Sequence, residues 1–139
     1  MIVVREKVRF VETDMMGVAH HSNHLRWFEM GRVEYLRKGG VNLWDLMDKG
    51  IVFPITEVEC RYKNSILFDD YILIETKLAL LTRAQMVFTY RVIREKDGLL
   101  MATGRTQNVF THKKSGSIVR LDKEYLDTLF TMYEGDKEA

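Results

Sequence analysis

The stretch from Phe10 to Arg32 reads FVETDMMGVAHHSNHLRWFEMGR and combines a turn signal with the start of a helical pattern. It contains one carboxylate inside the turn signal, Asp14, and three of the four histidines of the chain. Asp is favoured in turns and Gly17 adopts positive φ at little cost, so residues 13–17 are predicted to form a turn. This turn carries a possible catalytic carboxylate to the start of the longest predicted helix.

The segments on either side of this turn have different periodicities. Residues 2–11 alternate apolar and charged side chains, which predicts a β-strand. Residues 24–38 lack proline and are rich in helix formers, with Ser22 or Asn23 as the expected N-cap and Gly39-Gly40 as the end. The apolar side chains of this helix do not form one stripe, so we expect it to be buried on most sides. One side carries Leu25, Phe28, Tyr35 and Leu36, and Trp27 and Met30 point away from it.

The remainder of the chain is predicted to be mostly β-structure. Asp97-Gly98 is a strong hairpin signal, and the tail from Glu134 is charged and expected to be frayed. In the run that starts at Tyr71, alternation predicts that Ile72, Ile74, Leu78 and Leu80 point inward. The expected elements are a short helix over 41–50, strands over 51–63, 71–80, 85–94 and 99–112, a tight turn at 114–116, and a helix over 122–133.

This order of elements predicts an α+β domain in which one helix packs against a curved antiparallel sheet. Its 139 residues are the size of one domain, and we assign residues 1–139 to it. Apolar residues make up 46% and charged residues 29%, as in ordinary globular domains. The net charge of +1 provides no general attraction for nucleic acids, and no apolar run is long enough to span a membrane. A single cysteine and no recognisable signal peptide favour a cytoplasmic location.

Asp14 and His21 form the first candidate site. A carboxylate on a turn can act as a nucleophile or as a general base. The free N–H groups at a helix N-terminus can stabilise an oxyanion, and losing one good donor costs about 10²–10³ in rate. From residue chemistry alone, the more common role of an aspartate such as Asp14 is to close a turn.

Other clusters carry weaker signals. A metal site formed by His20, His21 and His24 is an alternative, but their spacing matches no standard zinc pattern. Cys60 lies on an apolar alternation and is expected to be a buried, inert thiol. Basic residues at strand ends and turns could bind phosphates or only keep strand edges solvated. These basic residues are Arg61, Lys63, Arg83, Arg105, Lys113 and Lys114.

With these residues in view, the chain resembles the hot-dog-fold acyl-CoA thioesterases of the 4-hydroxybenzoyl-CoA thioesterase type, including the small bacterial enzymes encoded with the Tol–Pal system. The family pattern is Thr-Asp-x-x-Gly-x-x-x-His-x-Asn-Tyr-Leu, followed by an aromatic pair, a Glu and an Arg. It runs here from Thr13 to Arg32, with His20 and His24 at positions that are commonly tyrosine. The resemblance covers essentially the whole chain. It implies a sheet of about five strands curved around one long central helix, with a short helix and a C-terminal helix.

The resemblance also implies roles for individual residues. Asp14 matches the catalytic carboxylate, and His21 matches the residue whose backbone N–H polarises the thioester carbonyl. The CoA phosphates would be held by basic residues, partly from a second copy in a dimer or tetramer, and our candidates are Arg83 and Lys113. No cofactor and no metal is implied. The residues expected near the substrate are His20, Asn23, His24 and Glu29.

The sequence therefore predicts an acyl-CoA thioesterase with a small-molecule substrate and an active site at a subunit interface. A thioesterase acting on acyl-carrier protein would use the same chemistry. A non-catalytic acyl-CoA-binding protein is a rival of another class, although a binder has no use for a carboxylate beside a thioester. A dehydratase on the same fold is less favoured, because no further Asp/His pairing occurs outside the stretch around Asp14.

Overall fold

The computed structural model describes residues 1–138 of the chain. Its elements follow the predicted order, with a 3₁₀ helix and two short strands in addition. They are β1 (Ile2–Lys7), η1 (Phe10–Glu12), α1 (Ser22–Lys38), α2 (Leu43–Asp48), β2 (Ile51–Val52), β3 (Ile55–Tyr62), β4 (Tyr71–Leu81), β5 (Gln85–Arg94), β6 (Leu100–Val109), β7 (Thr111–His112) and α3 (Lys123–Glu138).

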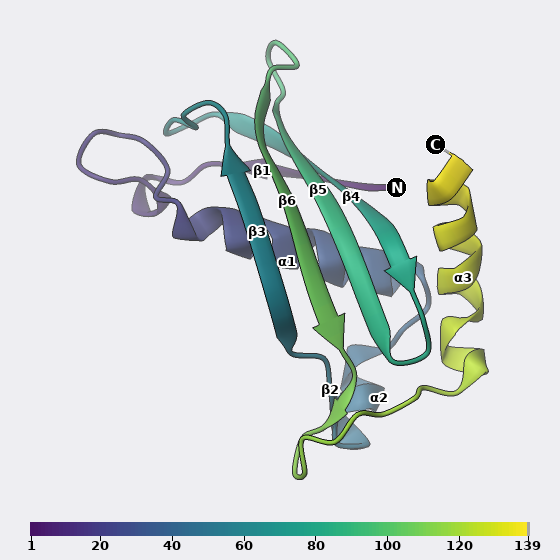
Figure 1. Cartoon of the computed structure of the whole chain (residues 1–139). Coiled ribbons are helices and arrows are strands. Elements are labelled where there is room, and N and C mark those ends of the chain that lie inside the picture. The colour runs from purple at the N-terminus through teal and green to yellow at the C-terminus, as the bar shows by residue number, and fades with distance from the viewer. Residues whose placement is uncertain (139) are drawn as a thin grey trace.

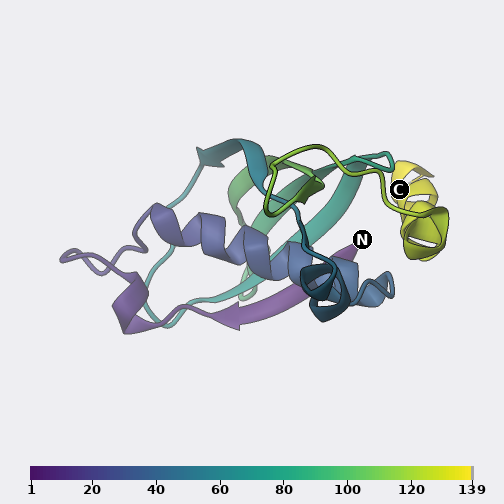
Figure 2. The same ribbon diagram turned by 90° about the horizontal axis from the view of Figure 1, so that it is seen from below.

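Five strands form one antiparallel sheet in the order β1-β4-β5-β6-β3 (Figure 1). The long helix α1 lies along one face of this sheet, which curls around it in the view from below (Figure 2). Strands β2 and β7 form a separate pair near α2, beyond one end of the sheet. The predicted α+β architecture is confirmed. Within the described residues, no helix combines the length and apolar character needed to cross a membrane.

The helix α1 buries one face rather than most of its circumference, which corrects the expectation from its sequence. The buried positions recur three and four residues apart, as on one side of an α-helix. Leu25 is 41% exposed and Glu29 is also exposed, whereas Trp27 is fully buried. The buried residues of α1 are Asn23, His24, Trp27, Phe28, Gly31, Arg32, Tyr35 and Leu36.

The start of α1 also differs from the prediction. The N-cap is His21, and neither Ser22 nor Asn23 caps the helix with its side chain. The Ser22 hydroxyl bonds the His20 ring instead, at 2.8 Å. Asn23 is buried and donates to the carbonyl of Glu12 at 2.8 Å. The capping-type side chains at this helix start are therefore used to hold the preceding loop.

Two strands depart from the alternation of side chains in the sequence. Strand β1 ends before the alternation does, and β4 changes the positions that it buries part-way along its length. The predicted strand over 2–11 stops at Lys7, and η1 follows with Glu12 accepting the backbone N–H of Arg9 at 2.8 Å. In β4 a register shift between Leu78 and Leu80 turns Leu80 outward, so Leu81 takes the buried position in its place. A β-bulge inserts one residue and thereby reverses the alternation beyond it.

The C-terminal tail is helical rather than frayed in its described part. Helix α3 continues to Glu138, and the buried Asp136 lies near its end. The carboxylate of Asp136 accepts hydrogen bonds from the hydroxyl of Tyr35, the backbone N–H of Leu78 and the amino group of Met1. This carboxylate therefore ties α3 to α1, β4 and the start of β1, a long-range contact that local composition does not reveal.

Candidate active site

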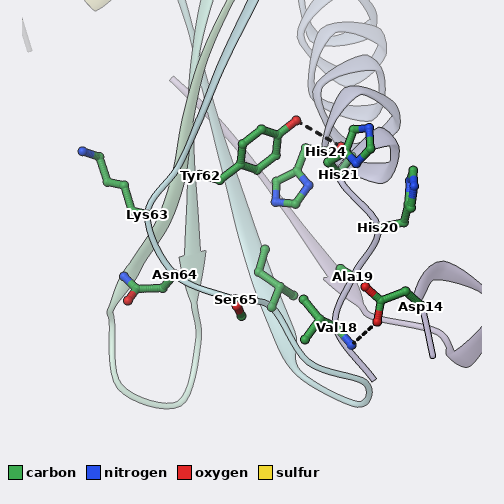
Figure 3. Close-up of a pocket in the computed structure, with 11 residues that line it drawn as sticks. Asp14, Val18, Ala19, His20, His21, His24, Tyr62, Lys63, Asn64 and Ser65 are labelled. Atoms are coloured by element: carbon green, nitrogen blue, oxygen red, sulfur yellow. Dashed lines mark hydrogen bonds between the residues drawn. The ribbon is translucent and has the colours of Figure 1, made fainter. Parts of the chain in front are cut away.

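A pocket of about 330 Å³ lies where the turn before α1 meets the segment after β3. Figure 3 shows residues of the turn and helix start on one side and residues from Tyr62 onward on the other. Hydrogen bonds between the backbones join the two sides, from Ala19 N–H to the Ile66 carbonyl (2.7 Å) and from Phe68 N–H to the Gly17 carbonyl (3.2 Å). The lining residues are Asp14, Val18, Ala19, His20, His21, His24, Tyr62, Lys63, Asn64, Ser65 and Ile66.

Asp14 both closes the turn and presents a carboxylate to the pocket. Its Oδ1 accepts the backbone N–H groups of Met16 (2.8 Å) and Val18 (3.3 Å), and its own N–H bonds the Val18 carbonyl at 2.8 Å. Gly17 completes the turn with a φ of +74°. Within the described chain, Oδ2 of Asp14 accepts no hydrogen bond. The turn role and the catalytic role are therefore compatible, because one oxygen fixes the loop and the other is available.

His21 contributes its main chain to the same pocket. Among the described residues, its backbone N–H donates no hydrogen bond, although it stands at the start of α1, where N–H groups commonly lack partners. Its carbonyl accepts from the backbone N–H of His24 (3.2 Å) and from the hydroxyl of Tyr62 (3.3 Å). These bonds fix the peptide on the other side of His21. The helix dipole adds a partial positive charge of roughly +0.5 at this end.

The histidines beside His21 have different environments. The His20 ring is exposed and lies 4.1 Å from the His21 ring, centroid to centroid. The His24 ring is only 4% exposed and packs between Trp27 and Tyr62, at centroid distances of 4.9 and 4.7 Å. Burial lowers the pKa of His24 to about 4, against an opposing effect of the His21 carbonyl. His24 is therefore a neutral imidazole at neutral pH.

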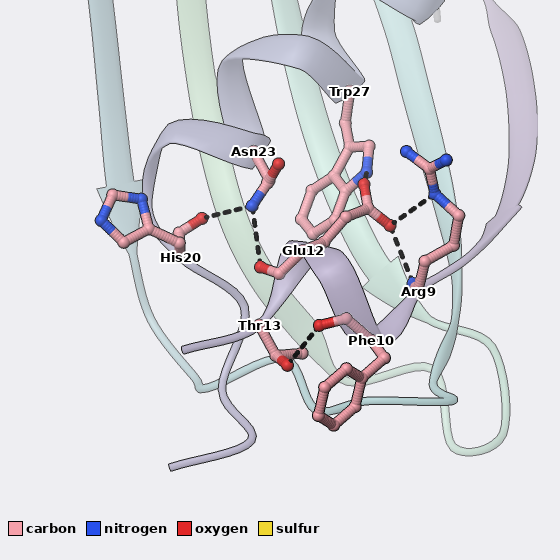
Figure 4. Close-up of polar contacts among 7 residues, drawn as sticks. All are labelled: Arg9, Phe10, Glu12, Thr13, His20, Asn23 and Trp27. Carbon is pink, nitrogen blue, oxygen red and sulfur yellow. Dashed lines mark hydrogen bonds and ion pairs between the residues drawn. The ribbon is translucent and has the colours of Figure 1, made fainter. Parts of the chain in front are cut away.

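A buried hydrogen-bond network holds the turn against α1 (Figure 4). The Glu12 carbonyl accepts from the Asn23 side chain and from the His20 backbone N–H, both at 2.8 Å. The Glu12 carboxylate accepts from Trp27 Nε1 at 3.3 Å and from the Arg9 backbone N–H at 2.8 Å. Asn23 therefore lies behind the pocket and does not line it. Its side-chain amide holds the loop before α1 in place.

Besides Asn23, three of the residues expected near the substrate lie outside this pocket. Glu29 is exposed on α1 and borders a separate hollow with Met30 and Arg37. Arg83, in the turn between β4 and β5, donates from Nε to the Leu121 carbonyl at 2.7 Å. Lys113 lies beside β7, at the end of the molecule where β2 and α2 are found. Within one chain, the structure joins Asp14, His20, His21 and His24 but none of these three.

The pocket also contains residues that sequence reasoning missed or misjudged. From the sequence, Lys63 is a candidate only for phosphate binding, and Tyr62, Asn64 and Ser65 are not among the expected site residues. A polar run directly after a predicted strand is the signal that could have indicated them. Trp27, which follows His24 on α1, is fully buried and does not line the pocket.

Other chemistries find little support in the geometry. Among the described residues, no three His, Cys, Asp or Glu side chains are grouped as a metal ion would need. Cys60 is half-buried, and burial raises the pKa of its thiol despite an opposing hydrogen bond with Tyr62. A raised pKa disfavours the reactive thiolate. Asp14 and the backbone N–H of His21 remain the candidate catalytic groups in the pocket.

Comparison with known proteins identifies the family. The family model of the thioesterase-like superfamily matches residues 8–129. The chain belongs to the thioesterase-like superfamily. It is 34% identical over 127 residues to a putative esterase of Aquifex aeolicus, covering 91% of this chain and 96% of that protein. It is also 26% identical to the putative acyl-CoA thioesterase YneP of Bacillus subtilis, over 95% of this chain and 94% of that one.

Solved structures of the superfamily agree with the fold. The DHNA-CoA thioesterase of Staphylococcus aureus superposes with a TM-score of 0.90 at 29% identity, over 98% of this chain and 93% of that chain. A structure from Thermus thermophilus gives a TM-score of 0.85 at 32% identity, over 94% and 98% of the two chains. The predicted hot-dog fold is therefore confirmed, and so is the predicted enzyme class, a thioester hydrolase.

Proposed function

We propose that the chain hydrolyses an acyl-CoA thioester to a free carboxylic acid and CoA, with Asp14 as the catalytic carboxylate. The observation that carries this proposal is that one pocket contains both an available oxygen of Asp14 and the unbonded backbone N–H of His21. Relatives named acyl-CoA thioesterases and the similarity to a DHNA-CoA thioesterase support the choice of a CoA thioester.

The proposed chemistry follows from these two groups. In the nucleophilic route, Asp14 attacks the thioester carbon, the CoA thiolate leaves, and water hydrolyses the resulting anhydride. In the general-base route, Asp14 takes a proton from a water that attacks the same carbon. In both routes the carbonyl oxygen becomes negative, and the His21 backbone N–H and the α1 dipole stabilise it. The His21 side chain would orient the water or Asp14.

A substitution at His21 separates the role of its side chain from the role of its backbone N–H. His21→Ala retains the main-chain N–H, so we expect a smaller loss of kcat than the roughly 100-fold loss proposed for Asp14→Asn. A loss equal to or larger than that of Asp14→Asn would instead assign a direct chemical role to the imidazole. Steady-state thiol release measures both variants.

We further propose that a second copy of the chain completes the substrate site. Strand β3 is an edge of the sheet, and all of its residues except Cys60 are exposed. Antiparallel pairing of two β3 edges would lay the end at Tyr62 beside the start at Ile55 of the other copy. The segment around Lys113, which lies next to β2, would then approach the pocket of that other copy. The result would be a dimer, with a tetramer as a further possibility.

This arrangement keeps Arg83 and Lys113 as candidates for binding the CoA phosphates, and His20, Asn23, His24 and Glu29 as residues that shape or support the substrate site. Acyl-pantetheine lacks the nucleotide phosphates of CoA, which makes it a matched control substrate. Lys113→Ala should raise KM for acyl-CoA about tenfold and leave KM for acyl-pantetheine unchanged. Equal effects on both substrates would remove Lys113 from phosphate binding, and Arg83→Ala can be judged in the same way.

A panel assay tests the function itself. Purified protein is given short, long and aromatic acyl-CoAs, and the same acyl groups on acyl-carrier protein, while thiol release is followed. Preferred release of CoA supports the proposal, and preferred cleavage of acyl-carrier protein supports the alternative thioesterase. Saturable acyl-CoA binding without thiol release would support a non-catalytic binding protein. The 4-hydroxybenzoyl-CoA type, the Tol–Pal-associated branch and a cytoplasmic location stay predictions from the sequence.

A further inference from the structure

The loop that carries Asp14 also carries the most exposed apolar side chains of the described chain. Phe10, Val11 and Met16 are 73% to 80% exposed, and Met15 is fully exposed. Among the described residues, only one other large apolar side chain reaches this range, and it lies on α2. Single apolar residues on a surface are ordinary, whereas a contiguous apolar patch marks an interaction site.

Two further apolar residues extend this surface from the segment before β4. The Phe68 ring packs edge-on against the Phe10 ring, with 5.5 Å between the centroids, and Leu67 forms an isolated antiparallel bridge with Val18. We call the resulting surface the apolar tip, and its residues are Phe10, Val11, Met15, Met16, Leu67 and Phe68, all exposed. The loop between η1 and α1 projects from the body of the molecule in two perpendicular views (Figure 1, Figure 2).

The backbone of the apolar tip is largely hydrogen-bonded within the loop itself. From Glu12 to Val18, every backbone N–H except that of Met15 donates to an acceptor in the chain. An extended segment of another protein binds by pairing with free backbone groups, and this loop offers few N–H donors for that. A lipid surface makes the opposite demand, because backbone groups that leave water there need partners within the protein.

The charged side chains beside the apolar tip are paired with one another. Lys7 pairs with Asp69 at 3.3 Å, and Arg9 pairs with Glu12 at 3.5 Å. The Asp14 carboxylate lines the pocket and accepts two N–H groups of its own turn. Recognition by the tip is therefore apolar and not electrostatic, which agrees with the net charge of only +1.

We propose that the apolar tip is a membrane-docking surface, which inserts its side chains at the boundary between lipid headgroups and acyl chains. A bilayer yields to a projecting shape, whereas a protein partner would need a matching hollow. An acyl-CoA is itself an amphiphile, whose acyl chain enters a bilayer while the CoA group stays in water. The inference rests on the proposed thioesterase function for its substrate, and it adds that the Asp14 pocket meets acyl-CoA at a lipid surface.

Co-sedimentation with neutral phosphatidylcholine vesicles tests the docking itself. The variant Val11→Gln/Met15→Gln removes two exposed apolar side chains and should weaken vesicle binding about tenfold or more. Trp44→Gln/Met47→Gln, at exposed apolar residues of α2, is the matched control and should bind within about twofold of the wild type. Binding should change little between about 0.05 and 0.5 M salt. Absence of wild-type binding, or binding only to anionic vesicles that salt abolishes, would overturn the inference.

A spectroscopic probe distinguishes insertion from another use of the same surface. Met15→Trp, made in the Trp44→Phe background, places a tryptophan on the tip, and brominated phosphatidylcholine should quench its fluorescence. Emission that brominated lipid leaves unchanged would contradict insertion. Sedimentation velocity of Val11→Gln/Met15→Gln should give the wild-type oligomeric state. A smaller assembly would show that a second copy of the chain covers the tip, which would also overturn the inference.

Two substrates separate this inference from the function on which it rests. Val11→Gln/Met15→Gln should slow hydrolysis of palmitoyl-CoA presented in vesicles about tenfold and leave that of dissolved butyryl-CoA within about twofold. If no acyl-CoA is hydrolysed but the wild type binds vesicles and this variant does not, the proposed function fails while the docking surface stands. If hydrolysis occurs but neither vesicle binding nor the palmitoyl-CoA rate depends on the tip, the function stands and the docking surface fails.

Discussion

The hydroxyl of Tyr62, at the end of the edge strand β3, donates a 3.3 Å hydrogen bond to the carbonyl of His21 at the start of α1. Partial burial, with Cys60 beside it, raises the pKa of Tyr62 to about 12, so the phenol stays protonated and remains a donor. This bond links the sheet to the residue that is proposed to supply the oxyanion N–H.

Tyr62→Phe should therefore lower kcat by roughly 3- to 10-fold, because the peptide between His21 and Ser22, next to the one that carries the oxyanion N–H, loses one of the groups that orient it. The stability loss should be small, about 1 kcal/mol or less, since Tyr62 is 51% exposed. Steady-state kinetics and a urea titration measure the two effects. Tyr71→Phe, at a tyrosine that does not line the pocket, is the matched control. A wild-type kcat in Tyr62→Phe would show that this bond does not position His21.

We predict that the side chain of Asn23 holds the loop before α1 in place and does not contact the substrate. Asn23→Ala removes the 2.8 Å bond to the Glu12 carbonyl inside the protein, so it should cost roughly 1–3 kcal/mol of unfolding free energy. It should lower kcat more than it raises KM, because the loop that carries Asp14 loosens. Denaturant unfolding and Michaelis–Menten kinetics provide both numbers. A rise in KM alone, with stability unchanged, would instead indicate direct substrate binding by Asn23.

Asp136 makes the stability of the fold sensitive to acid. Burial acts to raise the pKa of this carboxyl group, but the hydrogen bonds from Met1, Tyr35 and Leu78 outweigh burial and lower it. A carboxyl group with a depressed pKa in the folded state stabilises the fold above its unfolded pKa of about 3.9. That contribution is lost as the pH falls through the lower, folded pKa.

Asp136→Asn should therefore be less stable than the wild type at pH 7, and the difference should shrink below about pH 4. Thermal unfolding followed by circular dichroism between pH 7 and pH 2 measures this trend. The exposed Asp127, on the same helix, provides the control variant Asp127→Asn, which should match the wild type throughout. A pH-independent difference for Asp136→Asn would contradict a role for its ionised form.

His24 should make the stability of the fold depend on pH in a second window, above the window of Asp136. Its pKa is about 4 in the folded protein, below the ordinary value of 6.5, so the unfolded chain binds the proton more readily between these values. Stability should consequently rise as the pH increases from 4 to 6.5, by on the order of 1–3 kcal/mol. His24→Phe should flatten the curve in this window. If the variant and the wild type have parallel curves, the imidazole is not buried in its neutral form.

Local signals in the sequence predicted the elements that position Asp14 and His21. The turn at Asp14, the helix that follows it and the hairpin at Asp97-Gly98 all depend on neighbouring residues, and all three are present. The alternation predicts that Leu80 points inward, but a bulge reverses the alternation of β4 and turns Leu80 outward. The alternation in sequence contains no sign of an inserted residue.

Contacts between distant segments were not predictable in the same way. Tyr62 reaches the pocket because β3 pairs with β6 and its end then faces the start of α1. The bond between Asp136 and Tyr35 joins residues 101 positions apart, and nothing near Asp136 in the sequence indicates burial. The resemblance to a known motif, and not residue chemistry alone, favoured catalysis for Asp14.

The most direct test of the account is the kcat of Asp14→Asn on the best acyl-CoA substrate. The asparagine keeps an amide oxygen that can accept the Met16 and Val18 N–H groups, so the turn and the fold should survive, as circular dichroism can verify. We predict a fall in kcat of roughly 100-fold or more, because the variant can neither attack the thioester nor take a proton from water. Hydrolysis at the wild-type rate by a folded Asp14→Asn would contradict the assignment of Asp14 as the catalytic carboxylate.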